Sequence, residues 1–262
     1  RGDWAIFVKE QKLDENFKGI QGVGYSEVVL PKNKQQHEER IRNEGFANFK
    51  IHPEGKRALY TSIIYLEPFD ARNLRAFGYD MFSEKVRREA MTKAMQSGKA
   101  VLSGKIKLVQ EYDKDIQAGF LMYLPVYKKD FSLNTPEDKV SAIQGFVYAP
   151  FRANDLMNGI LGGMFADINF EIYDGHLALK ENILYNSNHQ STVYKKINIT
   201  MNDHTWTITF KTNSVFKNEH IYLIFLLPSV VLILTLLLYL LLNSLLKTKE
   251  NALQIAKKAT HK

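Results

Sequence analysis

Asp80 is the side chain whose type and position best suit specific chemistry. It follows an apolar segment, Tyr60 to Leu66, and a Gly-Tyr turn. A carboxylate at the mouth of an apolar concavity accepts charge-assisted hydrogen bonds from the N–H groups of a ligand, and these bonds are strong when water is excluded. Two structural roles compete equally with ligand binding: Asp80 could cap the helix that follows it, or form an ion pair with Arg87. The sequence leaves these alternatives open.

The other polar residues do not form a catalytic or metal-binding pattern. The carboxylate pair Glu38 and Glu39 lies in a polar helical segment, there is no Gly-x-Ser-x-Gly motif, and the chain has no cysteine to act as a nucleophile. The histidines lack the paired spacing of a metal site; they are His37, His52, His176, His189, His204, His220 and His261. We therefore expect no enzyme activity, no metal and no cofactor in this region.

An uncharged run, Ile221 to Leu246, predicts a membrane-spanning helix. A bilayer core requires about 20 predominantly apolar residues in a helix, and a charged residue at its centre costs roughly 2.5 to 3.5 kcal/mol. A buried helix of this length in a soluble protein almost always has a polar face. We therefore expect residues 221–246 to span the membrane.

The lysines around this run predict its orientation. Only one acidic residue, Glu250, accompanies the lysines that follow the run, which are Lys247, Lys249, Lys257, Lys258 and Lys262. The positive-inside rule then places the C-terminus in the cytoplasm and the residues before His220 in the periplasm or outside the cell, with the helix in the inner (plasma) membrane. The chain begins at Arg1 without a signal-like apolar segment, so we expect a first membrane helix upstream.

Composition argues against a nucleic-acid-binding protein. The net charge is +7, but basic residues alternate with acidic ones, as in HEERIRNEGF, and form no stripe of one sign. About 220 residues remain outside the membrane helix, which is enough for one or two domains with their own cores. Because the chain has no cysteine, such a domain depends on its core alone for stability.

Hydrophobic periodicity predicts an α+β fold. Helices are predicted over 3–17, 33–44 and 83–97, the last capped by Ser83, and strands over 25–30, 60–66, 100–110 and 119–127. This order is typical of a sheet with one covered face and a concavity between helix and sheet. After a polar linker at 128–139, strands at 143–148, 165–173, 183–185, 193–201 and 206–211 and a helix at 150–161 predict a second unit.

The region from Phe49 to Tyr127 carries the marks of a known family. These are Leu66-Glu67-Pro68, Asn73, Gly78 to Met81, Arg87 to Ala90, Gly98, Leu102, Gly104, Leu108 to Glu111, and Pro125-Val126-Tyr127. In these marks the chain resembles CHASE domains, the extracytoplasmic sensor modules of bacterial receptors and plant cytokinin receptors. The resemblance covers residues 4–148 well and continues more loosely to the membrane. It implies a long stalk helix, two PAS-like subdomains and a homodimer.

The resemblance divides the chain into five parts. Residues 1–20 would complete the stalk helix, 21–130 form the membrane-distal PAS-like subdomain, 140–216 the membrane-proximal one, 221–246 the transmembrane helix, and 247–262 the start of a cytoplasmic signalling helix. The implied function is to sense a small molecule and transmit its binding to a cytoplasmic histidine kinase or diguanylate cyclase. The alternative is a membrane-tethered structural or adhesion module without signalling output.

The resemblance also implies which residues bind the ligand. In cytokinin receptors the Asp at the position of Asp80 binds the adenine ring, and a main-chain group at the position of Leu102 assists. We therefore expect Asp80 and Leu102 to contact a cytokinin-like molecule or another heterocycle. The segment from Glu67 to Gly78 follows the bacterial version of the family, and no hydroxyl near Glu111 and Tyr112 matches the plant pattern, which leaves the ligand class open. For Glu67, Asn73 and Arg88 we expect structural roles.

Reporter fusions test the predicted topology. A fusion at Lys262 is expected to report a cytoplasmic location and a fusion at Lys128 a location on the other side of the membrane, because the lysines after the apolar run favour the cytoplasmic side. Activity of a topology-sensitive reporter at both positions is the measurement. Two fusions that report the same side would rule out the receptor topology.

Overall fold

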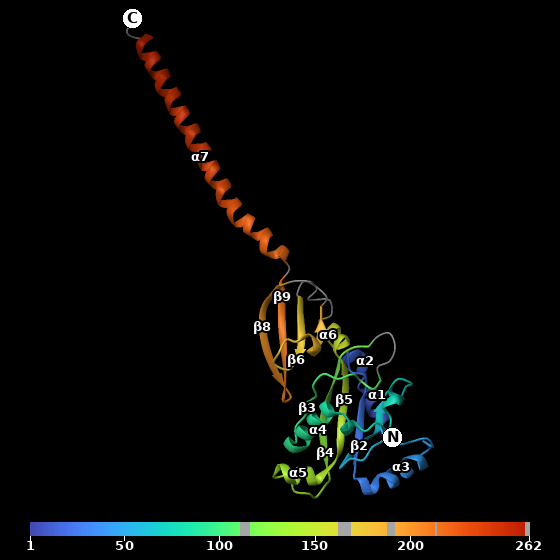
Figure 1. The fold of residues 1–262 in the computed structure, drawn as a ribbon. Coiled ribbons are helices and arrows are strands. Elements are labelled where there is room, and N and C mark those ends of the chain that lie inside the picture. The colour runs from blue at the N-terminus through green and yellow to red at the C-terminus, as the bar shows by residue number, and fades with distance from the viewer. Residues whose placement is uncertain (111–115, 162–168, 188–191, 213, 260–262) are drawn as a thin grey trace. The chain divides into compact units, whose positions relative to one another are not determined.

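The computed structural model describes residues 1–110, 116–161, 169–187, 192–212 and 214–259 (Figure 1). It divides into two units: Arg1–His189 with Val193–Lys211, and Gln190–Thr192 with Thr212–Lys262. The α-helices are α1 (Gly2–Glu10), α2 (Leu13–Asn16), α3 (Lys34–Asn43), α4 (Lys85–Ser97), α5 (Pro136–Ala142), α6 (Ala153–Leu161) and α7 (Ser214–Ala259). The strands are β1 (Val23–Val29), β2 (Tyr60–Glu67), β3 (Val101–Leu102), β4 (Gly119–Tyr127), β5 (Ile143–Arg152), β6 (Asn169–Asp174), β7 (Ile183–Asn186), β8 (Thr192–Met201) and β9 (His204–Thr212).

The first sheet is antiparallel and has the strand order β2-β1-β5-β4-β3. The sequence placed the strand at 143–148 in a second unit, whereas the structure places it, as β5, in the middle of the first sheet. There it pairs with β1, for example Gly24 with Tyr148, and with β4, for example Tyr123 with Tyr148. The predicted boundary between 130 and 140 therefore lies between β4 and β5, two neighbouring strands of the same sheet. Local periodicity identified the strand but could not identify its partners.

Helix α4 covers one face of this sheet, which we call the inner face (Figure 1). Its N-cap is Glu84, which accepts hydrogen bonds from the amides of Val86 and Arg87 at 3.0 and 2.9 Å, and Gly98 ends it with a φ of 76°. The predicted cap, Ser83, lies instead in a short 3-10 helix, Met81–Ser83. The inner cluster between helix and sheet consists of Ile63, Leu66, Ala76, Met81, Ala90, Met91, Ala94, Met95, Val101, Ile106, Leu108, Leu121, Tyr123, Ile143, Phe146 and Tyr148.

Helix α3 packs on the opposite, outer face. Successive residues of a strand point to opposite faces, so Val28 contacts the inner cluster while its neighbour Val29 belongs to an outer one. The outer cluster consists of Val29, Ile41, Phe49, Ile51, Tyr60 and Ile64. The first sheet is therefore covered on both faces, which explains why β2 reads as an almost continuous apolar strand.

The second sheet is also antiparallel, with the order β7-β6-β9-β8. Its apolar cluster is shared with the first sheet, since it combines Leu102, Phe120 and Ala153 with Phe170, Ile172, Leu184, Tyr185 and Trp206. The rings of Phe120 and Trp206, one from each sheet, lie 5.0 Å apart in an edge-to-face arrangement. The two sheets therefore pack as parts of one unit.

Three segments differ from the predicted pattern. The helix expected over 3–17 is interrupted at Lys12, whose φ of 48° is left-handed and cannot continue a right-handed helix. The expected linker contains α5, which begins with a capping box formed by Thr135 and Asp138. Of the strand expected over 100–110, only Val101–Leu102 pairs as a strand.

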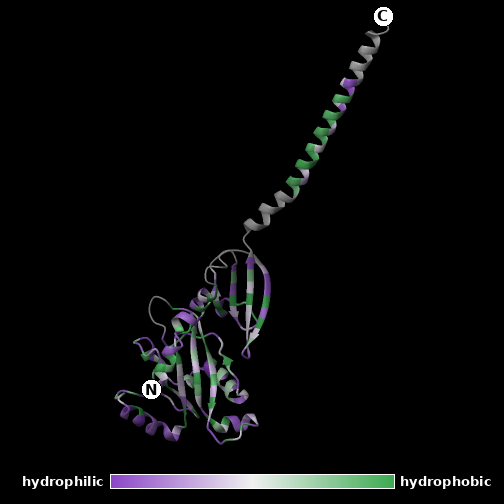
Figure 2. Cartoon of the chain, turned by 180° about the vertical axis from the view of Figure 1, so that it is seen from behind, coloured by the Kyte–Doolittle hydropathy of each residue, from purple (hydrophilic) through white to green (hydrophobic). Residues whose placement is uncertain are grey.

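Helix α7 forms most of the second unit. Its segment Phe225–Lys249 has a mean hydropathy of 2.7 and none of it is buried, so by length and composition it can cross a membrane. Figure 2 shows hydrophobic residues on consecutive turns of this segment. Pro228 lies inside the helix. The helix extends beyond the predicted span in both directions and continues without a break into the expected signalling segment as far as Ala259.

The core accounts for a first stability prediction. Phe146→Ala removes a fully buried ring from the inner cluster, and large-to-small changes of this kind lower the free energy of unfolding by about 3–5 kcal/mol. Leu124→Ala on β4 is the control, because Leu124 is 47% exposed, and we expect a change within about 0.5 kcal/mol. Chemical denaturation measures both. Equal losses in the two variants would contradict the assigned inner face.

Candidate functional site

Asp80 is fully buried at the edge of the inner face, immediately before the 3-10 helix Met81–Ser83. Its Oδ1 accepts hydrogen bonds from the main-chain amides of Thr61 and Phe82 at 2.8 and 3.1 Å, and from the Thr61 hydroxyl at 3.3 Å. Through these hydrogen bonds Asp80 connects the start of β2 to the 3-10 helix. The structure therefore gives Asp80 a capping role, which was one of the alternatives that the sequence left open.

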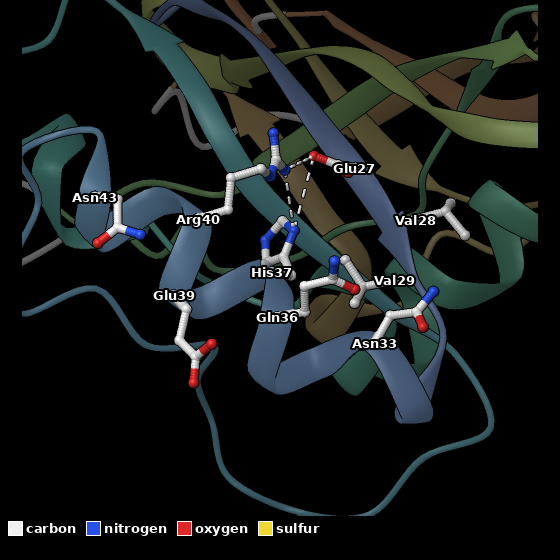
Figure 3. Close-up of a pocket in the computed structure, with 9 residues that line it drawn as sticks. All are labelled: Glu27, Val28, Val29, Asn33, Gln36, His37, Glu39, Arg40 and Asn43. Atoms are coloured by element: carbon white, nitrogen blue, oxygen red, sulfur yellow. Dashed lines mark hydrogen bonds and ion pairs between the residues drawn. The ribbon is translucent and has the colours of Figure 1, made fainter.

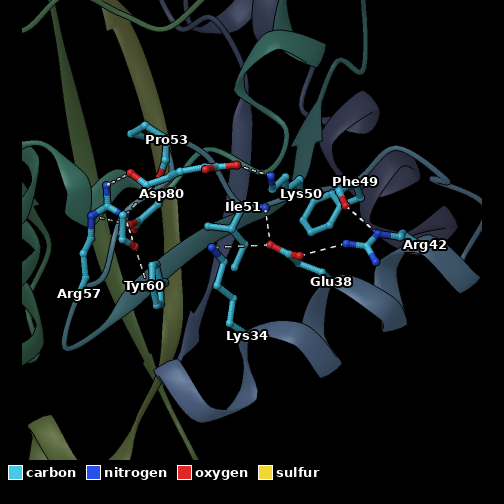
Figure 4. A network of polar contacts seen from close by, with 12 residues as sticks. Lys34, Glu38, Arg42, Phe49, Lys50, Ile51, Pro53, Arg57, Tyr60 and Asp80 are labelled. Carbon is cyan, nitrogen blue, oxygen red and sulfur yellow. Dashed lines mark hydrogen bonds and ion pairs between the residues drawn. The ribbon is translucent and has the colours of Figure 1, made fainter.

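The cation beside Asp80 is Arg57, and the pairing considered with Arg87 is not the one that the structure contains. The Nε of Arg57 lies 3.3 Å from Oδ2 of Asp80 (Figure 4). The same guanidinium donates to the main-chain oxygens of Pro53 and Gly55 at 3.2 and 3.3 Å, so it also closes its own loop. Arg87 instead lies 3.7 Å from Glu84 and donates to the oxygen of Lys107.

The buried position of Asp80 affects its ionisation. Burial raises the pKa of the Asp80 carboxyl above its usual value, because the charged form loses its water. The Thr61 amide, the Arg57 guanidinium and the Phe82 amide oppose this rise. Oδ2 has the ion pair with Arg57 but no hydrogen-bond donor among the described residues. One oxygen of a desolvated carboxylate is thus available to a donor group.

Further polar atoms on the inner face lack partners. Ser26 pairs with Phe146 in the sheet and Tyr148 pairs with Gly24, so both side chains share the face of the inner cluster. Within the described part of the chain, neither the Ser26 hydroxyl nor the Tyr148 hydroxyl has a hydrogen-bond partner, although both are buried. The Tyr123 hydroxyl contacts only the Met81 sulfur, at 3.6 Å, and sulfur is a weak acceptor.

The close approach of Tyr148 to the sheet requires a glycine. A Cβ at Gly24 would lie 2.5 Å from the Tyr148 hydroxyl oxygen, which is closer than real contacts allow. Gly24 thus lets the phenol lie flat on the strand while its hydroxyl stays inside the core. A buried hydroxyl without a partner costs about 1–3 kcal/mol. Such a buried hydroxyl calls for an explanation.

Leu102 lies on β3 with its side chain on the other face of the sheet. Its neighbour Val101 belongs to the inner cluster, whereas Leu102 belongs to the cluster shared with the second sheet. Asp80 forms a bridge with Ser62 on β2, whereas Leu102 lies on β3, the other edge strand, so β1, β5 and β4 separate the two predicted site residues within the sheet. The Leu102 amide donates to the Asn202 oxygen at 3.1 Å. Of the plant-pattern positions, Glu111 and Tyr112 lie outside the described residues.

Three other family marks make local contacts. The Asn73 amide group donates to the main-chain oxygens of Gln21 and Pro68 at 3.2 and 2.8 Å. The Glu67 carboxylate accepts from the Phe69 amide, and Arg88 donates to the Phe82 oxygen. Apart from the contact between Asn73 and Gln21, which joins segments 52 residues apart, each contact lies within a turn or at a helix start.

Sequence reasoning missed Arg57, Ser26 and Tyr148. Arg57 lies in a polar loop without any motif, so nothing marked it. Ser26 and Tyr148 lie in predicted strands, and their alternation with apolar neighbours could have shown that they face inward, but only if the inner face had been known. Their importance comes from the pairing of β1 with β5, which local patterns do not reveal.

A second candidate pocket lies between α3 and β1 (Figure 3). It is lined by Glu27, Val28, Val29, Asn33, Gln36, His37, Glu39, Arg40 and Asn43. Arg40 pairs with Glu27 across it, and burial, aided by Arg40, lowers the pKa of His37 to about 4, so this imidazole is neutral at pH 7. Small-molecule sites are mainly apolar with a few placed polar groups. This pocket is mainly polar and lacks the apolar wall of such sites.

Comparison with known proteins identifies the kind of module. A family model described as "CHASE domain" matches residues 1–185, which is more than half of the chain. The chain therefore belongs to the CHASE domain family, and the resemblance drawn from the sequence is confirmed. CHASE domains are extracellular sensor modules of receptors and have no catalytic activity. One C-terminal apolar helix, α7, fits a membrane-anchored receptor.

Two individual proteins are similar to this chain. "Probable histidine kinase 4" of Oryza sativa subsp. japonica is 26% identical over 145 residues, which are 54% of this chain and 13% of that protein. The chain therefore matches only a small part of that relative's length. A solved structure, "Extracellular ligand binding receptor from Desulfohalobium retbaense DSM5692", is aligned over 80% of this chain and 33% of its own, with 11% identity and a TM-score of 0.44.

Asp80→Asn tests the ionisation of the buried carboxyl. The raised pKa means that the folded state binds the proton more tightly than the unfolded state, so the stability of the wild type falls as the pH rises above about 4. The amide cannot ionise. We expect the free energy of unfolding of the variant, relative to that of the wild type, to increase with pH over this range.

The control is Asp130→Asn, which replaces an exposed carboxylate by an isosteric amide at a position with a φ of 66° that Asn also tolerates. Its stability difference from the wild type is the baseline against which that of Asp80→Asn is compared. Denaturation midpoints at several pH values measure both variants. A flat difference for Asp80→Asn would show that the carboxyl ionises as freely in the folded state as in the unfolded chain.

Proposed function

We propose that this chain is the sensor region of a transmembrane signalling receptor that binds a small polar molecule at the inner face of the first sheet. The ligand would displace part of the packing between the sheet and α4, with the Asp80 carboxylate accepting hydrogen bonds from its N–H groups and the main chain of Leu102 assisting. A heterocycle, cytokinin-like or of another kind, fits a site with one carboxylate, two tyrosine hydroxyls and an apolar wall. Its binding would bias a cytoplasmic histidine kinase or diguanylate cyclase.

One observation carries this proposal: some of the buried polar atoms that lack a hydrogen-bond partner among the described residues lie on or beside the inner face. They are the Ser26 and Tyr148 hydroxyls and, apart from its ion pair, Oδ2 of Asp80. Buried polar groups in native proteins are almost always hydrogen-bonded, and each exception calls for an explanation. A ligand with donors and acceptors would satisfy all three atoms.

The remaining parts of the proposal concern architecture. Two antiparallel sheets, each with helices against it, support two PAS-like subdomains, one distal and one proximal to the membrane. Because β5 belongs to the first sheet, the boundary between them would lie after Arg152. The lysines after Leu246 support a cytoplasmic C-terminus. The exposed apolar residues Ile6 and Phe7 on α1 support pairing of the N-terminal helices in a homodimer.

Tyr148→Phe separates a binding role from a packing role. The change removes an unpartnered hydroxyl, so we expect the free energy of unfolding of the ligand-free protein to rise by up to about 1–3 kcal/mol. At the same time the affinity for a heterocycle, with adenine as the first probe, should fall about tenfold, the equivalent of about 1.4 kcal/mol. Calorimetric titration and chemical denaturation of the full chain measure the two effects.

Tyr127→Phe is the matched control, because the Tyr127 hydroxyl donates to the Met95 main-chain oxygen at 2.6 Å. We expect this variant to lose about 1 kcal/mol of stability and to bind the probe as the wild type does. If Tyr148→Phe also loses stability, the hydroxyl has a structural partner and the inner face is an ordinary core. If no member of a heterocycle panel binds the wild type, the proposed ligand class is wrong.

A further inference from the structure

A carboxylate from the second sheet holds the main chain next to β3. Oδ2 of Asp174, at the end of β6, accepts a hydrogen bond from the Lys105 amide at 2.8 Å. Oδ1 of the same carboxylate lies 2.5 Å from Nε2 of His204, the first residue of β9. The side chains of His204 and Asp174 are only 20% and 21% exposed. Asp174 thus connects the segment after β3 to two strands of the second sheet.

Gly104 makes room for this carboxylate. A Cβ at this position would lie 2.9 Å from Oδ2 of Asp174 and 3.1 Å from Cγ1 of Val86 on α4. Any other residue would therefore force either the carboxylate or α4 away. The need for glycine here is spatial, because the chain passes between α4 and the second sheet with no room for a side chain.

A second hydrogen bond holds the other end of the same segment. The Leu102 amide donates to the main-chain oxygen of Asn202 at 3.1 Å. Asn202 and Asp203 form the tight turn between β8 and β9, with φ values of 48° and 56°. The main chain from Leu102 to Lys105 is therefore hydrogen-bonded at both ends to the second sheet. We call this arrangement, formed by Asp174, His204 and the Asn202 oxygen, the clamp.

We propose that Asp174 is a positioning residue for the ligand site: through the clamp it holds the Leu102–Lys105 main chain in place and couples that segment to β9. This inference rests on the proposed function, in which the Leu102 main chain contacts the ligand. A ligand that moves this segment must move the β8–β9 turn with it or break two hydrogen bonds. Strand β9 is followed directly in the chain by α7, so the clamp links the site to the strand that leads into the membrane helix.

Amide hydrogen exchange of the full chain in membrane nanodiscs tests the clamp. In Asp174→Ala, peptides covering residues 101–107 and 204–212 should exchange at least tenfold faster, while peptides from β1 and β2 exchange as in the wild type. If the substitution instead destabilised the whole fold, exchange would accelerate throughout the first sheet. Affinity for the adenine probe should also fall at least tenfold. Asp174→Asn retains an oxygen that can accept from the Lys105 amide, and it should restore part of the protection.

Asp203→Asn is the control, since Asp203 lies in the same turn, is largely exposed and pairs with Lys93 at 3.6 Å, and Asn also tolerates its φ of 56°. It should change neither exchange nor affinity. Unchanged exchange over 101–107 in Asp174→Ala would overturn the inference, as would exchange that rises equally in the control. If the exchange pattern is as expected but the wild type does not bind the probe, the clamp stands and the ligand class of the proposed function fails instead.

Discussion

The buried carboxylate of Asp80 is the constraint on which the first sheet unit depends. Removing a charge from water costs several kcal/mol unless its oxygens are paired. The chain meets this requirement by bringing together the start of β2, the 3-10 helix Met81–Ser83 and the loop that carries Arg57. Helix α4 begins directly after this junction, so its position over the inner face follows from the same contacts.

Much of the fold could be predicted from local patterns. The ranges of α3, α4 and β2, and the apolar part of α7, agree closely with the hydrophobic periodicity, because these elements depend on residues near one another in the sequence. The place of β5 in the first sheet could not be predicted, since strand pairing depends on residues far apart. The capping box of Thr135 and Asp138 was present in the sequence, but the polar composition around it concealed α5.

The candidate site was predictable only where a motif marked it. Asp80 was found because a recognisable Gly-Tyr-Asp-Met run contains it. Arg57, the cation that pairs with Asp80, was not found. It lies in a loop without sequence signals, and an ion pair between residues far apart in the sequence leaves no local pattern. The inward hydroxyls of Ser26 and Tyr148 became significant only once β1 and β5 were known to be neighbours.

The pairing of β1 with β5 also affects how the protein is made. Gly24 pairs with Tyr148, so a chain synthesised from its N-terminus produces β1, β2, α4 and β4 before the strand that joins them. Contacts between residues so distant in sequence form slowly. The chain has no cysteine, so no disulfide can hold β1 and β4 together before β5 is made. Until β5 is complete, β1 and β4 each present an unpaired edge to which other chains can add. The nascent protein therefore exposes both of these edges until residues 143–152 have been made.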